Sequence, residues 1–211
     1  MKIQKKITYV DIEVRQEYEF EPVEDTVELR EVKDGYELRY LTLDNEPVLP
    51  NEWQNESLFL VNYHCNFWVE SGICAKNVLG YIYTGNETEY DREGAEALLK
   101  EYYCLPIDSY IHSGVRLSLA GGFAGRLPQG HEQFDVSRVG AILVSKAVFK
   151  TKKRAEEAAE GLVTEWNMLL SGDVYRLVSE KLDRDKKRID YDIVCGYAGY
   201  DYAKDALKTE I

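Results

Sequence analysis

The stretch Leu105–Lys146, LPIDSYIHSGVRLSLAGGFAGRLPQGHEQFDVSRVGAILVSK, decides the fold of this chain. It predicts two strand-like runs, Ile107–Ser118 and Arg138–Val144, joined by a loop that holds four glycines. Two of the three histidines of the chain, His112 and His131, lie within it. Functional side chains often sit on loops that a rigid scaffold carries, so this stretch is the first place to look for a site.

Length and composition are those of an ordinary globular protein. The chain has 211 residues, of which 45% are hydrophobic and 30% are charged. No apolar run approaches the roughly 20 residues that a membrane span needs, and the N-terminal stretch MKIQKKITYVDIEV lacks the apolar core of a signal peptide. We therefore expect a cytoplasmic protein without membrane association. The four cysteines are scattered without a CxxC pair, which predicts buried free thiols.

The charge of the chain is negative and unevenly distributed. The formal net charge is −12, and residues 1–56 carry 15 acidic and 7 basic residues, a net charge of −8 in that part. An acidic field repels nucleic acid and attracts basic proteins. The simpler interpretation is that the acidic surface maintains solubility.

The N-terminal third is predicted to form antiparallel sheet. Apolar and charged side chains alternate from Val10 to Glu21, which is typical of a strand with one buried and one solvated face. The segments Thr26–Val32 and Tyr36–Leu43 flank Asp34-Gly35, a strong hairpin signal. Two further strands are expected: Ser57–Tyr63, as a central strand buried on both faces, and Val78–Tyr83.

Two main helices follow from apolar residues at helical spacing. They cover Tyr90–Tyr103, where Thr88–Asp91 has the form of a capping box, and Thr151–Leu170, whose apolar stripe ends at Ser171-Gly172. A hairpin of Asp173–Lys181 and Ile189–Gly196 and a short helix Tyr202–Leu207 complete the chain. The order of elements predicts an α+β fold with antiparallel sheets and two main helices. We expect one α+β domain over residues 1–211. The alternative is a weak boundary near residues 84–90, between an N-terminal sheet (1–85) and an α+β core (90–211).

The polar residues around His112 suggest nucleophilic catalysis, but weakly. Asp108 and either Ser113 or Ser118 could complete a triad, in which a base activates a nucleophile and a third group orients the base. The chain has no GxSxG nucleophile elbow. A histidine that closes the end of a strand through hydrogen bonds is the preferred interpretation.

Metal and phosphate sites have no recognisable motif either. Ligands for a metal could come from His64, Cys65, His112, His131 or Asp135, but neither HExxH nor a paired spacing is present. The glycine-rich loop at residues 120–130 matches neither GxxxxGK[ST] nor GxGxxG. The sequence therefore predicts no metal site, no cofactor and a flexible surface loop.

Three motifs of the C-terminal half occur together. They are Tyr110-Ile111-His112-Ser113-Gly114, Phe134–Gly140 with Asp135 and Gly140, and Leu170-Ser171-Gly172-Asp173-Val174-Tyr175. In this combination the chain resembles a family of uncharacterised bacteriophage and mobile-element proteins, in which the first motif reads Tyr-Asp-His-Ser-Gly. Ile111 stands here in place of the family's acid. The resemblance implies an accessory protein that acts in the cytoplasm of a bacterial host, and it implies no particular activity.

Two hypotheses about function remain. The first is an anti-CRISPR or anti-restriction protein that binds and inhibits a host nucleic-acid-handling defence system without itself binding nucleic acid. Its partner would be a basic host protein, and its binding residues would be Glu17, Glu19, Glu21, Glu24 and Asp25. The second is a small hydrolytic or metal-assisted enzyme centred on His112, with Asp108 and Asp135. The uneven charge favours the non-enzymatic binder.

Overall fold

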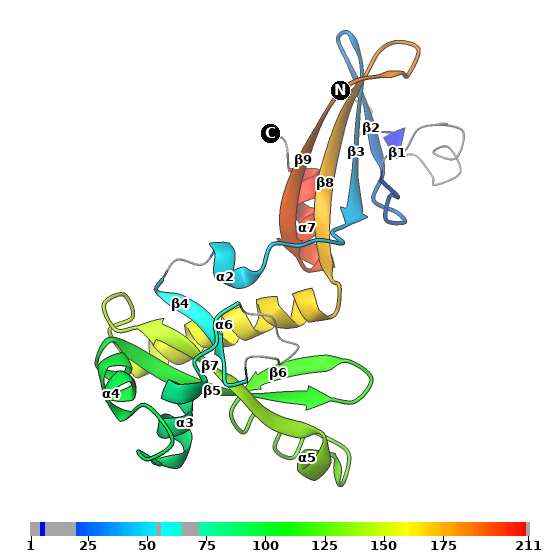
Figure 1. The fold of residues 1–211 in the computed structure, drawn as a ribbon. Coiled ribbons are helices and arrows are strands. Elements are labelled where there is room, and N and C mark those ends of the chain that lie inside the picture. Colours follow the sequence, from blue (N-terminus) through cyan, green and yellow to red (C-terminus); the bar gives the residue numbers. More distant parts are fainter. Residues whose placement is uncertain (1–4, 7–19, 54–55, 65–71, 210–211) are drawn as a thin grey trace. The chain divides into compact units, whose positions relative to one another are not determined.

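The chain folds into two compact units. Unit 1 comprises Met1–Pro47 and Gly172–Ile211, and unit 2 comprises Val48–Ser171. The structure, a computed structural model, describes residues 5–6, 20–53, 56–64 and 72–209 (Figure 1). It contains helices and two antiparallel sheets, so the predicted α+β class is confirmed. The expectation of a single domain stays a prediction.

The sheet of unit 2 has four antiparallel strands in the order β4-β7-β5-β6. These strands are β4 (Leu58–Asn62), β5 (Tyr102–Ile111), β6 (Val115–Leu119) and β7 (Val136–Ser145). The predicted strand Arg138–Val144 is confirmed within β7. The prediction of one strand over Ile107–Ser118 is wrong, because a turn at residues 112–114 divides that run into β5 and β6. The expected strand Ser57–Tyr63 is confirmed as β4 and is buried on both faces, but its predicted central position is wrong, since β4 is the first strand of the order.

Five helices belong to unit 2: α2 (Pro50–Trp53), α3 (Lys76–Thr84), α4 (Arg92–Glu101), α5 (His131–Phe134) and α6 (Lys152–Leu170). Both predicted main helices are confirmed as α4 and α6. The cap of α4 is Asp91, whose carboxylate accepts from the Gly94 N–H at 2.9 Å, rather than Thr88. The prediction of a strand over Val78–Tyr83 is wrong, because this apolar run lies in α3 and turns Leu79 and Ile82 onto the sheet at helical spacing.

Helices cover both faces of the unit 2 sheet. On one face, Ala159, Leu162 and Trp166 of α6 pack against strand residues such as Leu60 and Ile142 (Figure 1). On the other face, side chains of α3 and α4 pack against the strand residues that point the opposite way, including Val61, Ala141 and Leu143. Alternate residues of a strand point to opposite faces, so this sheet is apolar on both. The apolar stripe predicted for Thr151–Leu170 is therefore core, as expected.

The sheet of unit 1 has five antiparallel strands in the order β1-β2-β3-β8-β9. Its elements are β1 (Lys5–Lys6), β2 (Glu28–Val32), β3 (Gly35–Leu43), β8 (Val174–Leu182), β9 (Arg188–Ala198) and α7 (Tyr200–Lys208). The two predicted hairpins and the C-terminal helix are confirmed. Most of the predicted strand Val10–Glu21 lies outside the described residues.

The two faces of the unit 1 sheet differ. One face carries a buried cluster that includes Leu38, Tyr40 and Val178. On the other face α7 packs Ala203 and Leu207 against Leu41 and Leu177. The rest of that second face carries charged side chains, among them Glu37 and Lys181.

Two sequence predictions concern the environment of the chain. Among the described helices, none is long and apolar enough to cross a membrane.

The prediction of free thiols is correct for Cys104 and Cys195 but wrong for Cys74, which is disulfide-bonded. Burial is also only partial, because Cys104 is half-buried and Cys195 is exposed. Spacing along the sequence does not reveal which cysteines the fold brings together.

Candidate functional site

The candidate site lies where β5 ends and β7 begins. Tyr110 of β5 is paired with Val136 of β7, and the Ile111 N–H donates to the Asp135 carbonyl at 2.9 Å. This backbone contact places His112, the first residue of the β5–β6 turn, beside Asp135. Residues 23 positions apart in the sequence thus become neighbours.

The short helix α5 brings a second histidine to the same place. Gly130 precedes α5 with a φ of 92°, a left-handed conformation that glycine adopts readily. The Asp135 N–H then donates to the His131 carbonyl at 2.9 Å, which closes one helical turn. Residues four apart in a helix lie on one face, so the His131 and Asp135 side chains meet.

The three side chains form a compact cluster around the Asp135 carboxylate. Its Oδ2 atom lies 2.8 Å from His131 Nδ1 and 3.6 Å from His112 Nδ1. The potential ligand atoms of the three residues all lie within 4.8 Å of one another. The side chains of His131 and Asp135 are 27% and 26% exposed, whereas that of His112 is 59% exposed. The cluster is therefore supported by the protein on one side and open to solvent on the other.

Aromatic rings hold the imidazoles in place. The Tyr110 hydroxyl lies 3.1 Å from His131 Nδ1, and its ring stacks beside His112 with a centroid distance of 6.2 Å. Phe123, in the glycine-rich loop, contacts the Tyr110 ring with a centroid distance of 5.9 Å. Glu132 fixes the same loop, because its Oε1 accepts from the Gly125 N–H at 2.7 Å. The loop thus helps to build the site instead of being only a flexible surface segment.

Asp108, which the enzyme hypothesis placed beside His112, belongs to a different group. Its Oδ1 accepts from Arg138 Nε at 2.5 Å, and its Oδ2 accepts from the Gly121 N–H at 3.2 Å. The Arg138 guanidinium in turn lies 5.3 Å from the centroid of the Tyr83 ring. Burial raises the pKa of the Tyr83 hydroxyl well above its ordinary value, and this hydroxyl donates to the Gly140 carbonyl at 2.6 Å. This group joins α3, β5 and β7.

The structure does not form the triad that the sequence suggested. Ser113 is exposed in the turn, and Ser118 is paired with Asp108 across β5 and β6. Within the described part of the chain, no hydrogen bond joins His112 to either serine. His64 follows β4 and contacts Tyr63, with a centroid distance of 4.5 Å, and does not belong to the cluster.

The predicted acidic binding residues lie in unit 1. Glu21, Glu24 and Asp25 are exposed in the segment that leads to β2. Glu17 and Glu19 lie outside the described residues.

Sequence reasoning named all three members among its candidate metal ligands but predicted no metal site, and its enzyme hypothesis gave His131 no role. The available signal was the His-x-x-x-Asp spacing of His131 and Asp135 directly after Gly130, because a single helical turn aligns such a pair. Two imidazoles and one carboxylate are common ligands of zinc, which uses three protein ligands and one open position in catalytic sites. The cluster can therefore hold a divalent metal ion and leave a coordination position open.

No family model, curated protein or solved structure matches the chain. The resemblance to bacteriophage and mobile-element proteins stays a prediction. The function of the chain is therefore inferred from the geometry of the described residues.

Proposed function

We propose that the chain binds one divalent transition-metal ion, most favourably zinc, through His112, His131 and Asp135. The observation that carries this proposal is the convergence of the three ligand atoms within 4.8 Å of one another. Ligand atoms around tetrahedral zinc lie about 3.3 Å apart, given bonds of about 2.0 Å. The distances of 2.8 and 3.6 Å from Asp135 Oδ2 bracket that value, so small side-chain shifts suffice to form the site.

The ligand set favours zinc over iron and manganese. Sites of nitrogen and oxygen ligands bind divalent first-row metals more tightly along the series from manganese to copper, and zinc binds more tightly than iron or manganese. The Tyr110 hydroxyl lies beside the same nitrogen, His131 Nδ1, so it would have to move aside when that nitrogen binds the metal ion.

The reaction class that such a centre supports is hydrolysis, the second hypothesis of the sequence analysis. A zinc ion with an open position lowers the pKa of a water there to about 7, which makes hydroxide available at neutral pH. Held by His112, His131 and Asp135, such an ion would supply the nucleophile for hydrolysis of an ester or a phosphodiester. The exposed side of His112 gives a substrate access to this position.

Metal titration of the purified chain tests the binding proposal. Metal-stripped protein is expected to take up one zinc ion per chain, measured by elemental analysis and by competition with a zinc-chelating dye. Replacing His131→Ala or Asp135→Asn is expected to weaken zinc binding by more than about 100-fold, because losing even an outer-shell partner costs 10–100-fold. His64→Ala is the matched control, since this exposed histidine lies outside the cluster. Equal zinc affinity in all four proteins would overturn the site.

Hydrolysis is tested separately on the zinc-loaded protein. A nitrophenyl ester and a nitrophenyl phosphodiester are suitable probes, with release of nitrophenol as the readout. Zinc-dependent release that is lost in Asp135→Asn would support the reaction class. Binding without release would restrict the function to metal binding.

We also propose a second function, in which unit 1 binds a basic, nucleic-acid-handling protein of a bacterial defence system. The supporting observation is the exposure of Glu21, Glu24 and Asp25 in one short segment. Capture of such a protein from nuclease-treated bacterial lysate by the tagged chain is the test. Capture should be lost when the three acids are changed to lysine, and unchanged capture would refute this binding surface.

A further inference from the structure

The last strand of the unit 1 sheet has one side without a partner among the described strands. β9 is eleven residues long and is paired with β8 alone. Its side chains include Ile189 and Tyr191, which are 67% and 47% exposed. A strand at the edge of a sheet presents unpaired N–H and C=O groups, to which an extended segment of another chain can add.

Charges of opposite sign alternate across one face of this sheet. One row joins four strands through the register pairs Arg30–Glu37, Glu37–Lys181 and Lys181–Asp190. Lys181 Nζ lies 3.6 Å from Asp190 Oδ2, and both side chains are largely exposed. Cross-strand neighbours of opposite charge stabilise each other modestly. The last residue of this row, on β9, is Asp190.

The neighbouring row breaks the alternation. Glu28 is paired with Arg39, Arg39 with Ser179, and Ser179 with Asp192. A neutral hydroxyl thus stands between Arg39 and Asp192, and Asp192 makes no hydrogen bond or ion pair with any described residue. Arg39 does not compensate, because its buried guanidinium donates to the carbonyls of Ala206 and Thr209 at the end of α7.

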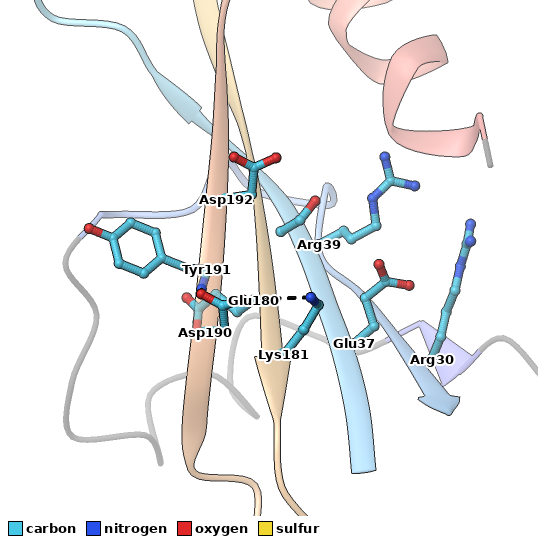
Figure 2. A pocket seen from close by; sticks show the side chains of 9 residues that line it. Arg30, Glu37, Arg39, Glu180, Lys181, Asp190, Tyr191 and Asp192 are labelled. Carbon is cyan, nitrogen blue, oxygen red and sulfur yellow. Dashed lines mark hydrogen bonds and ion pairs between the residues drawn. The ribbon is translucent and has the colours of Figure 1, made fainter. Parts of the chain in front are cut away.

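These rows line a cavity of about 270 Å³ beside β9 (Figure 2). Its charged lining residues are Arg30, Glu37, Arg39, Glu180, Lys181, Asp190 and Asp192. On the β9 side the cavity has two carboxylates, and the β8 neighbour of one of them, Asp192, is the neutral Ser179. A cationic side chain entering from the open edge of β9 would complete the alternation.

The opposite face of β9 carries Tyr191 and Ile193, and the Arg188 guanidinium lies 5.1 Å from the centroid of the Tyr191 ring. Ile193 is paired with Val178 and packs against the buried cluster of that face. Tyr191 points to the side away from Arg30, Glu37 and Arg39 (Figure 2). Asp190 and Asp192 therefore lie on one face of β9, and Tyr191 and Ile193 lie on the other.

We propose that β9 docks an extended segment of a partner protein in which basic and apolar residues alternate. The segment adds a strand to the sheet, places lysine or arginine side chains over Asp190 and Asp192, and places apolar side chains beside Tyr191 and Ile193. A second copy of β9 paired antiparallel about Tyr191 would bring Asp190 opposite Asp192, which is unfavourable between neighbouring strands. Charge thus selects a basic partner over self-association. This surface is independent of the metal centre and of the acidic segment at residues 21–25.

A labelled nine-residue peptide that alternates lysine with valine and threonine is the probe, with fluorescence anisotropy in about 0.15 M salt as the readout. The wild-type chain should bind it. The double variant Asp190→Lys, Asp192→Lys should weaken binding by at least about tenfold, which corresponds to about 1.4 kcal/mol. The matched control is Glu157→Lys, Glu160→Lys, which changes the net charge equally at exposed positions of α6 in unit 2. The control should keep the wild-type affinity, and circular dichroism should show all variants folded.

Two further measurements distinguish strand addition from charge attraction. A peptide with the same residues but N-methylated at alternate positions cannot donate the hydrogen bonds of a new strand, so its binding should be lost. Equal binding of the methylated peptide, or an equal loss of affinity in the two double variants, would overturn the proposal. Light scattering that shows a dimer dissociated by Asp190→Lys, Asp192→Lys would assign β9 to a second copy and would also overturn it.

Discussion

The two sheets of this chain differ in how their faces are covered. In unit 2, α6 covers one face and α3 and α4 cover the other, so both faces are apolar and buried. In unit 1, the second face has an apolar part under α7 and a charged part that lines the cavity beside β9. Burial of apolar surface stabilises unit 2 on both sides of its sheet, whereas unit 1 also relies on paired polar groups.

This difference explains where each unit can carry function. In unit 2, α3, α4 and α6 cover the faces of the sheet. Its candidate ligand side chains therefore lie at the ends of strands, in the turn after β5 and at the short helix α5. The unit 1 sheet leaves a strand edge and a charged face available, which suits contact with another chain. The coverage of each sheet thus accounts for the location of both proposed sites: the metal site at the strand ends of unit 2 and the docking site along β9 of unit 1.

The largest expected effect is the loss of the α6 core of unit 2. Trp166 is 1% exposed and lies in the cluster that α6 forms with the sheet. Trp166→Ala should lower the free energy of unfolding by about 3–5 kcal/mol, because it leaves a large cavity. Denaturant unfolding followed by circular dichroism measures this. Val148→Ala, at an exposed position of unit 2, should change it by less than about 0.5 kcal/mol. Equal effects would contradict the assignment of α6 as core.

A buried polar pair is expected to matter next, and it tests unit 1. The Tyr40 hydroxyl donates to Glu180 Oε1 at 2.8 Å, and both residues are buried. Tyr40→Phe should lower the free energy of unfolding by about 1.5–3 kcal/mol, the range for hydrogen bonds to charged groups. Tyr36→Phe on the same strand is the control, because no hydrogen bond to its hydroxyl is found among the described residues. If both variants unfold alike, unit 1 does not depend on this pair.

Two glycines of unit 2 should respond to alanine with opposite signs. A Cβ atom at Gly140 in β7 would lie 2.1 Å from the Val61 carbonyl oxygen of β4, and backbone cannot yield cheaply. Gly140→Ala should therefore destabilise the protein by about 1–3 kcal/mol, as overpacking does. Gly161, exposed in α6, has no atom within 4 Å of such a Cβ, so Gly161→Ala should stabilise the protein by up to about 1 kcal/mol. Thermal unfolding of both variants measures this, and a Gly140→Ala variant as stable as the wild type would show that β7 and β4 can separate.

The fold could be predicted from the sequence where apolar residues recur with a clear strand or helix period. The Asp34-Gly35 turn and the alternation around it predicted the hairpin of β2 and β3, and the long apolar stripe predicted α6. The α3 segment failed because a short apolar run fits a buried strand and a helix equally well. The edge position of β4 could not be foreseen either, because strand order depends on pairings between distant segments.

The candidate site was only partly predictable for the same reason. His112 and Asp135 were singled out by residue type, but their meeting depends on the backbone contact between Ile111 and Asp135. The β5 strand shifts its register on β7 at Ile107/Asp108, and Asp108 pairs with Arg138. Such a shift has no signature in the sequence, so proximity along the chain grouped Asp108 with His112 in the enzyme hypothesis, although its carboxylate contacts Arg138.

The two free cysteines provide the smallest expected effect and compare the coverage of the two sheets directly. Burial raises the pKa of the Cys104 thiol from 9.0 to about 11, whereas Cys195 on β9 is exposed. Only the thiolate reacts, so iodoacetamide at pH 8 should label Cys195 and leave Cys104 intact, as peptide mass spectrometry can measure. Because the folded-state pKa lies above the unfolded one, the protonated Cys104 thiol favours folding; this contribution is complete below pH 9 and is lost as the pH rises through 11. Labelling of Cys104 should therefore begin only toward that pH. Equal labelling of both thiols at pH 8 would show that α3 and α4 do not close their face of the unit 2 sheet.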